Sequence, residues 1–299
     1  MQSSISNLAQ TGALVLLYHA TFSNVPTELQ NDLHNIHPDV LRTHIEYLSE
    51  FYCFVSVDEL AAMSDPRGFA AVTFDDGYRC VFDETMPLLE SLGVPFTVFL
   101  NSGNFEGAVF WRDKVRLISS LGLIAEFEAF MDGIDSAVDE RFYRYTKSPR
   151  NNSEVVDRQL DLFLESQCLE VRGSGYCVTS LEELPDSAYV NYGNHSHRHY
   201  VLSSLLSTEQ NLEIKNTKNW LDKLPAEKCS GIFSVPFGAL GDFDERTVAA
   251  LKENNYDKVL LSRNRLHTEF GLHAHGIAAI ERFMPRSSEK DAGLSFFLA

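Results

Sequence analysis

Short hydrophobic runs and amphipathic segments alternate along most of the chain. The hydrophobic runs predict buried strands, and apolar residues at helical spacing predict helices between them. Strands are predicted at residues 14–17, 53–57, 70–74, 95–100, 188–191, 231–235, 258–261 and 276–283. Helices are predicted at residues 40–48, 82–92, 207–221 and 244–254, with a short helix beginning at residue 57. Residues 20–38 contain two prolines and are predicted to form a loop.

The order strand, helix, strand over residues 70–100 is one βαβ unit, which favours a parallel sheet. From residue 104 to about residue 178, the strand pattern gives way to charged segments with helical spacing. We interpret residues 104–178 as a helical insertion that shapes a substrate site. No internal repeat divides the sequence, so residues 1–299 are expected to form a single α/β domain that carries this insertion.

Two adjacent carboxylates follow the predicted strand at residues 70–74. Alternation along a strand sends Asp75 and Asp76 to opposite sides, and Gly77 lets the backbone turn tightly beyond them. In a sheet built of strand–helix units, ligands bind at this carboxyl end of the strands. The alternative is that Asp-Asp-Gly is only a turn signal.

A histidine cluster follows the predicted strand at residues 188–191. On a helical turn, His195 and His199 would share one face and could bind one metal ion, while His197 would point elsewhere. Two imidazoles and one carboxylate form a ligand set that suits Zn, Co, Ni or Mn. The sequence does not choose among these metals, and Zn is the ion we expect. The alternative is a polar loop that happens to be rich in histidine.

Metal-assisted hydrolysis also needs a carboxylate that is not a metal ligand. The metal lowers the pKa of water, and a nearby base takes the proton as the water attacks a carbonyl carbon. Asp75 and Asp76 are adjacent but divergent, so they can divide the roles of base and ligand. The sequence therefore predicts hydrolysis of an amide or an ester.

The charge of the chain argues against two classes of partner. The formal net charge is −17 at pH 7, which disfavours a nucleic acid and an anionic membrane surface. No hydrophobic segment has the length of a secretory signal or a transmembrane span. The five cysteines are scattered and lack CxxC spacing, which favours reduced thiols. On these grounds we expect a cytoplasmic protein.

Three motifs in this order resemble the polysaccharide deacetylase family, also called NodB-homology or carbohydrate esterase family 4 enzymes. They are TFDDG at residues 73–77, HSxxH at residues 195–199 and PFG at residues 236–238. The similarity extends from residue 17 to about residue 282. The segment Phe110–Trp111 and the inserted helices resemble a subgroup found in surface-polysaccharide biosynthesis.

The resemblance implies a distorted (β/α) barrel of seven or eight strands with one divalent metal ion at its mouth. By motif position, Asp75 is expected to be the catalytic base. Asp76, His195 and His199 are expected to be the metal ligands. The backbone N–H of Phe237 is expected to help hold the oxyanion.

The chain departs from the family pattern at two positions. Many members have, at the position of Ser234, an arginine that orients the catalytic base. We expect Arg282, from a later strand, to replace it, and the alternative is a surface arginine. The late Leu-x-His motif, whose histidine protonates the leaving group, is not cleanly present. His275 is our candidate for this role, with His273 and His19 as alternatives.

We therefore expect a metal-dependent hydrolase that removes an N-acetyl group from an amino sugar in a glycan, a glycolipid or an activated sugar. An O-acetyl esterase or a deformylase acting on a carbohydrate is a close alternative, because the same site attacks any suitably placed acyl carbon. A catalytically silent carbohydrate-binding protein that keeps the barrel is an alternative of a different class.

Overall fold

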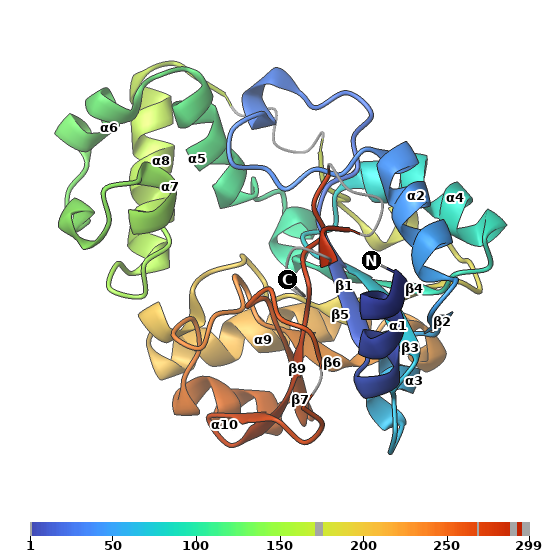
Figure 1. The fold of residues 1–299 in the computed structure, drawn as a ribbon. Coiled ribbons are helices and arrows are strands. Elements are labelled where there is room, and N and C mark those ends of the chain that lie inside the picture. The colour runs from blue at the N-terminus through green and yellow to red at the C-terminus, as the bar shows by residue number, and fades with distance from the viewer. Residues whose placement is uncertain (1, 171–175, 268, 288–291, 295–299) are drawn as a thin grey trace.

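The protein is built on one curved sheet (Figure 1). The computed structural model describes residues 2–170, 176–267, 269–287 and 292–294. Along the sheet the strands follow the order β1-β3-β4-β5-β6-β7-β9-β8, and β2 pairs with β3 beside this path. The strands are β1 (Leu14–Tyr18), β2 (Cys53–Phe54), β3 (Phe69–Phe74), β4 (Phe96–Leu100), β5 (Val190–Asn194), β6 (Cys229–Ser234), β7 (Lys258–Leu261), β8 (His273–Ala274) and β9 (Ile277–Glu281).

The sheet closes into a barrel. Neighbouring strands are parallel from β1 through to β9, and β8 pairs antiparallel with β9. Beyond β9 the chain returns to β1, where Leu16 and Phe283 form a parallel bridge. Two backbone hydrogen bonds accompany it, from Leu17 N to Phe283 O at 2.9 Å and from Phe283 N to Val15 O at 2.8 Å. The predicted distorted (β/α) barrel of seven or eight strands is confirmed.

Apolar side chains fill the barrel below the carboxyl ends of its strands. We call this group the apolar layer, and it consists of Val15, Ala71, Phe99, Ile232, Leu260 and Ile280, with Val57 and Leu60 from α3 (Val57–Ala62). The strand β5 contributes Gly193 instead of a large side chain, because a Cβ there would collide with the Phe99 ring. Burial of this layer contributes about 25 cal/mol per Å² of apolar surface.

Helices cover the outside of the sheet (Figure 1). Besides α3 they are α1 (Gln2–Thr11), α2 (Pro38–Leu48), α4 (Met86–Ser91), α9 (Ser207–Leu221) and α10 (Glu245–Glu253). Their buried faces follow the helical spacing of the sequence, as with Leu41, Ile45 and Leu48 in α2. Within the described residues, no helix has the length and apolar character needed to cross a membrane.

The segment from residue 104 to residue 178 is helical, and its helices gather beside the barrel (Figure 1). They are α5 (Trp111–Ser120), α6 (Ile124–Phe130), α7 (Phe142–Tyr145) and α8 (Ser153–Ser166). Phe127 lies at the centre of their aromatic core, with ring centroids 5.5 Å from Phe142 and 5.4 Å from Phe163. Residues 171–175 lie outside the described residues. That barrel and insertion form a single domain stays a prediction.

Three local predictions were wrong. The strand predicted at residues 53–57 ends at Phe54, because Ser56 forms a capping box with Glu59 and starts α3. The sequence spacing of Ser207 and Gln210 predicts a capping box at the start of α9, but this box does not form. Instead, the Glu209 carboxylate accepts from the N–H of residue 206 at 2.8 Å. Helix α1 was not predicted in the polar segment at residues 1–12.

Candidate metal centre and active site

Polar side chains lie above the apolar layer, at the carboxyl ends of the strands. Strand residues two positions apart share a face, so the next inward positions lie two residues after the apolar layer. They carry Thr73, Asn101, Ser234, Ser262 and Arg282. Just after β3, Asp75 lies two residues beyond Thr73 and shares its inward side. Just after β5, His195 lies two residues beyond Gly193 in the same way. The site therefore forms where the sequence predicted it, at the carboxyl ends of parallel strands.

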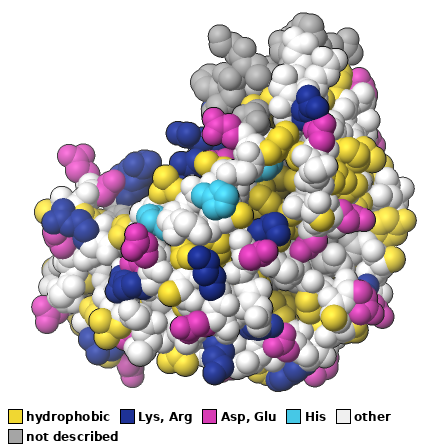
Figure 2. Space-filling model, turned by 90° about the horizontal axis from the view of Figure 1, so that it is seen from below, with side chains coloured by type: hydrophobic (Ala, Val, Ile, Leu, Met, Phe, Trp, Pro, Cys, Tyr) yellow, Lys and Arg dark blue, Asp and Glu magenta, His cyan; other side chains and the backbone are white. Residues whose placement is uncertain are grey.

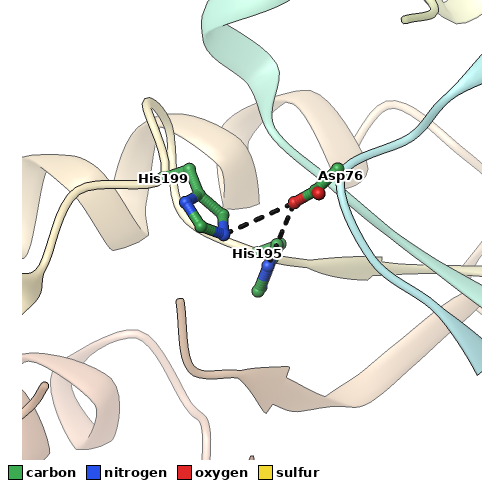
Figure 3. A group of neighbouring side chains, drawn as sticks. All are labelled: Asp76, His195 and His199. Carbon is green, nitrogen blue, oxygen red and sulfur yellow. Dashed lines mark ion pairs between the residues drawn. The ribbon is translucent and has the colours of Figure 1, made fainter. Parts of the chain in front are cut away.

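Asp76, His195 and His199 converge in one buried cluster (Figure 3). One ligand atom from each lies within 4.8 Å of the others. Asp76 Oδ1 is 3.5 Å from His195 Nε2 and 3.4 Å from His199 Nε2. This spacing places the three atoms around a common centre, so the predicted ligand set is brought together.

The donor atoms of this cluster suit a divalent transition metal ion. Asp76 Oδ1 and His199 Nδ1 are buried and have no hydrogen-bond partner within the described residues. His195 Nδ1 lies 2.9 Å from the carbonyl oxygen of Ser234, which makes Nδ1 the protonated nitrogen and leaves the Nε2 lone pair for a ligand. Two imidazoles and a carboxylate with open positions beside them form a catalytic type of metal site.

Electrostatics at the cluster favour a bound cation. Burial acts to lower the pKa of His195, but the negative charges of Asp75 and Asp76 outweigh burial and raise it. Burial lowers the pKa of His199 well below its usual range, which keeps this imidazole neutral. Burial acts to raise the pKa of Asp76, but the two histidines hold it below its usual range. The carboxylates therefore attract positive charge, which a metal ion bound at the cluster would supply.

The segment from His195 to His199 is a turn and not the predicted helical turn. The Asn194 side chain accepts from Ser196 N at 2.9 Å, and Ser196 Oγ accepts from His199 N at 3.0 Å. Ser196 and His199 both have positive φ, at 65° and 60°, and Asp76 has φ 74°. Such backbone strain is concentrated at functional sites, where the surrounding contacts hold it in place.

The second aspartate of the motif forms a buried ion pair. Arg282 Nη1 donates to Asp75 Oδ1 at 2.9 Å, and Nη2 donates to Oδ2 at 2.7 Å. Ser234 Oγ lies 3.1 Å from Asp75 Oδ1 and accepts from Arg282 Nη2 at 3.0 Å. Burial acts to raise the pKa of Asp75, but Arg282, together with His195 and His19, more than offsets burial and the pKa is lowered. The structure thus places Arg282 at the carboxylate of Asp75, as expected from the sequence, with Ser234 as a further partner.

Phe237 occupies the turn after β6, at the same cavity. Its φ is 62°, and its backbone N–H donates to no group in the described part of the chain. Gly238 follows with φ 71°, and a Cβ at this position would collide with Ser262. The turn therefore packs tightly on the next strand and leaves one N–H unused.

The structure separates the three histidines considered for leaving-group protonation. His275 is exposed, and its Nε2 is 2.8 Å from the carbonyl oxygen of Leu240, outside the cavity lining. His273 is also exposed and bonds to its own loop. His19 lines the cavity with Asp75 and Asp76. The geometry therefore disfavours our choice of His275, because its ring does not reach Asp75 or Asp76, and it favours the alternative His19.

A hydrogen bond to a second histidine, His34, holds the ring of His19 in place. His34 Nε2 lies 2.9 Å from the carbonyl oxygen of Pro285, so this nitrogen is the donor and His34 Nδ1 is an acceptor. His19 Nδ1 lies 3.3 Å from His34 Nδ1 and donates to it. Burial lowers the pKa of His34 to about 3 and also lowers the pKa of His19. His19 Nε2 is left to face the cavity without a hydrogen bond to the described residues.

The insertion supports the metal ligands directly. The Trp111 indole N–H donates to the carbonyl oxygen of His199 at 3.0 Å. The rings of Phe110 and Phe237 pack against His199, with centroids 5.2 and 4.5 Å away. Tyr78, next to the acid motif, donates to Asp113 of α5 at 3.0 Å. These contacts tie α5 to the barrel mouth.

The cavity of about 240 Å³ also contains side chains that the sequence analysis did not single out. They are Asp32, His34, Arg112, Arg116, Tyr143, Lys147, Ser262 and Met284. No motif marks them: most reach the site through the packing of the insertion and of the loop before α2, while Ser262 and Met284 follow β7 and β9. The only local signal was the position of Arg112 next to the Phe110–Trp111 segment.

This barrel, with an Asp-His-His cluster and a second paired aspartate at the strand ends, agrees with the arrangement that the resemblance to the polysaccharide deacetylase family implies. A sequence profile of the family "Polysaccharide deacetylase" matches residues 62–128, which include β3, the acid pair and β4. No curated protein matches the chain by sequence at a significant level. The family match and the fold confirm the resemblance of the chain to this family.

Solved structures with the same fold include several deacetylases. PplD of Streptococcus pyogenes is 15% identical with a TM-score of 0.58, over 96% of this chain and 98% of that chain. IcaB of Ammonifex degensii is 15% identical with a TM-score of 0.54, over 97% and 98%. The putative polysaccharide deacetylase BA0330 of Bacillus anthracis is 13% identical with a TM-score of 0.55, over 95% and 68%. At these identities the likeness concerns the fold.

Proposed function

We propose that this protein is a metal-dependent hydrolase that removes an N-acetyl group from an amino sugar. The observation that carries the proposal is the position of Asp75. Its Oδ2 lies 3.5 Å from His195 Nε2, beside the ligand cluster but held apart from it by the two bonds from Arg282. A carboxylate so placed can act as a base next to a metal ion.

Asp76, His195 and His199 would hold the metal ion. When bound, a divalent metal supplies Lewis acidity, which lowers the pKa of water and polarises a carbonyl group. Asp75 accepts the proton of the attacking water at the carboxylate oxygens, and Arg282 keeps this carboxylate ionised and oriented. The buried setting strengthens these interactions, because little water competes for them.

Two further groups act on the acetyl amide. The unused N–H of Phe237 donates to the oxygen of the acetyl carbonyl as negative charge develops on it. The proton that Asp75 takes from the attacking water passes to the Nε2 lone pair of His19, which then delivers it to the departing amine nitrogen, while His34 holds the ring of His19 in position through Nδ1. The structure of PplD, which shares this fold, was determined in complex with acetate, the product of such a reaction.

The test combines metal content with acetate release. Purified protein is expected to bind about one transition-metal ion per chain, measured by mass spectrometry, and His195→Ala is expected to lose it. Asp75→Asn is expected to retain the metal and lose acetate release from N-acetylglucosamine derivatives. Chelation is expected to abolish acetate release, and added zinc to restore it. Metal binding in neither protein, or acetate release by Asp75→Asn at the wild-type rate, would overturn the proposal.

A further inference from the structure

The cavity of the active site has an unusual concentration of positive charge on the side of the insertion. Arg112 and Arg116 from α5, and Lys147 after α7, line the same cavity as Asp76 and His199. The chain as a whole carries a net charge of −17. On the face shown in Figure 2, charged side chains of both signs are interspersed. A group of three cations at one cavity is therefore a local feature.

Arg112 is fully buried and has no carboxylate partner among the described residues. It donates to Thr146 Oγ1 at 3.1 Å and to the carbonyl oxygen of Tyr143 at 2.9 Å, while its Nε has no partner. Its guanidinium lies 4.5 Å from the ring centroid of Trp111 and 4.3 Å from that of Tyr143. Burial lowers the pKa of Arg112 to about 10. The direct contacts that hold this guanidinium in place therefore include no carboxylate.

Lys147 is the second cation without a carboxylate partner in the described part of the chain. Its Nζ lies 4.8 Å from the ring centroid of Phe237 and 5.0 Å from that of Tyr143. Arg116 differs, because it pairs with Asp113 at 2.7 Å and bonds to the Tyr78 hydroxyl. The excess positive charge is thus carried by Arg112 and Lys147, next to the turn that holds Phe237.

Other carboxylates at the cavity do not account for these cations. Asp75 is already paired with Arg282, and Asp76 belongs to the ligand cluster. Asp32 also lines the cavity and its charge acts on Arg112, but its side chain is exposed and forms no ion pair with Arg112 or Lys147 among the described residues. A buried cation without a counter-charge is costly, so its retention at a cavity indicates a negative group that arrives with a ligand. Arginine and lysine are the side chains that proteins use to bind carboxylate and phosphate oxygens.

A second cavity, of about 560 Å³, continues from this point. It shares Asp32, Tyr143 and Lys147 with the first cavity and extends between α6 and α7. Lys147 therefore stands at the junction of the two cavities. A ligand longer than one sugar can occupy both and place a negative group at the junction.

We propose that the insertion builds an anion-binding subsite at Arg112, Lys147 and Tyr143, and that the substrate is an N-acetylated sugar with a phosphate or carboxylate group near the scissile amide. This inference rests on the proposed deacetylase function and adds the substrate class. The phosphate could belong to an activated or lipid-linked sugar, and the carboxylate to an acidic glycan. Both present the same chemistry to the subsite, and the experiment separates them.

The test measures binding without turnover, in the full-length Asp75→Asn protein loaded with zinc. Calorimetry compares N-acetylglucosamine with its 1-phosphate, its 6-phosphate and N-acetylmuramic acid, which carries a carboxylate. At least one charged sugar is expected to bind roughly tenfold more tightly than the uncharged sugar, as for hydrogen bonds to a charged group. The charged sugar that binds best identifies phosphate or carboxylate as the group.

Lys147→Met in the same background is expected to remove most of this preference, and Lys147→Arg to retain it. Lys223→Met is the matched control, because the Lys223 Nζ also lies over an aromatic ring, 3.4 Å from the Trp220 centroid, but outside the cavity lining. The control is expected to keep the preference. Increasing salt should weaken binding of the charged sugar.

Equal binding of charged and uncharged sugars would overturn the subsite, even if the wild-type protein releases acetate from both. A preference that survives Lys147→Met would also overturn the subsite as proposed, because Lys147 would then not bind the anion. Conversely, a third result is that Lys147→Met removes the preference while the wild-type protein releases acetate from none of the sugars. That result would support the subsite and overturn the deacetylase function. The two failures are therefore distinguishable.

Discussion

Arg282 and Asp75 form a two-bond ion pair inside the barrel, with Nη1–Oδ1 and Nη2–Oδ2 distances of 2.9 and 2.7 Å. Arg282 is fully buried and also donates to Ser262 Oγ at 2.8 Å. It follows Ile280 of the apolar layer by two residues, so strand alternation aims it into the barrel. The Asp75 carboxylate, which must be ionised to act as the base of the proposed reaction, is thereby held in its ionised form.

Removal of this arginine should shift the pH dependence of activity. In Arg282→Met, the largest effect that offsets the burial of Asp75 is lost, so the pKa of Asp75 rises. Because the base acts only when deprotonated, the acidic limb of the kcat/KM profile should move to higher pH. Loss of one partner of a buried pair should also lower the free energy of unfolding by about 3–5 kcal/mol, measured in urea.

The control for this variant is Ser234→Ala, which removes one hydrogen bond from Asp75 and keeps the arginine. Its acidic limb should move less, and its loss of stability should be about 1 kcal/mol. An acidic limb that stays at the wild-type pH in Arg282→Met, in protein that remains folded, would contradict the role of Arg282.

His19 lines the cavity and His275 lies outside its lining, so the effects of substituting these two histidines can be compared directly. His19→Gln should lower kcat by about 10²-fold or more, because proton transfer to the leaving group contributes 10²–10⁴-fold. His275→Gln should change kcat only a few-fold, since the His275 ring bonds to Leu240 outside the cavity. Metal content should remain near one ion per chain in both variants. The reverse order of effects would restore His275 as the proton donor.

The barrel was predictable because its strands and helices follow local periodicities. The acid pair and the histidine pair were predictable because each lies directly after a hydrophobic strand. The turn at residues 195–199 was not, because side-chain bonds from Asn194 and Ser196 replace the helical ones. Helix α1 was missed because only Ile5, Leu8 and Ala9 form its buried face among the described side chains.

The cations at the cavity could not be predicted from the sequence, and the reason is a different one. Arg112 and Lys147 lie 35 residues apart in an insertion without motifs, and only tertiary packing brings both to Phe237. In the same way, His19 ended a predicted strand, but the bond to His34 depends on the loop at residues 20–38. The metal identity and the cytoplasmic location stay predictions.

The tight turn at the oxyanion donor can be tested with two glycines. Gly238 and Gly276 both have positive φ, at 71° and 85°. An added methyl group would collide with Ser262 at Gly238, whereas no heavy atom lies within 4 Å at Gly276. Gly276→Ala should therefore lose about 1–2 kcal/mol of stability from backbone strain alone. Gly238→Ala should lose more and should also lose activity. Equal stability losses in urea would contradict this account of the turn.

The last prediction concerns the support that the insertion gives to the metal ligands. Trp111→Phe removes the donor to the carbonyl oxygen of His199 and leaves this oxygen buried without that bond. Loss of an outer partner of a metal ligand typically weakens metal affinity 10–100-fold, and we expect about tenfold in zinc competition with a chromogenic chelator. Trp220→Phe is the matched control, because the Trp220 indole bonds at 3.4 Å to an exposed glutamate, Glu106, and should leave zinc affinity unchanged. Equal zinc affinity in the two variants would mean that α5 does not hold the His199 turn.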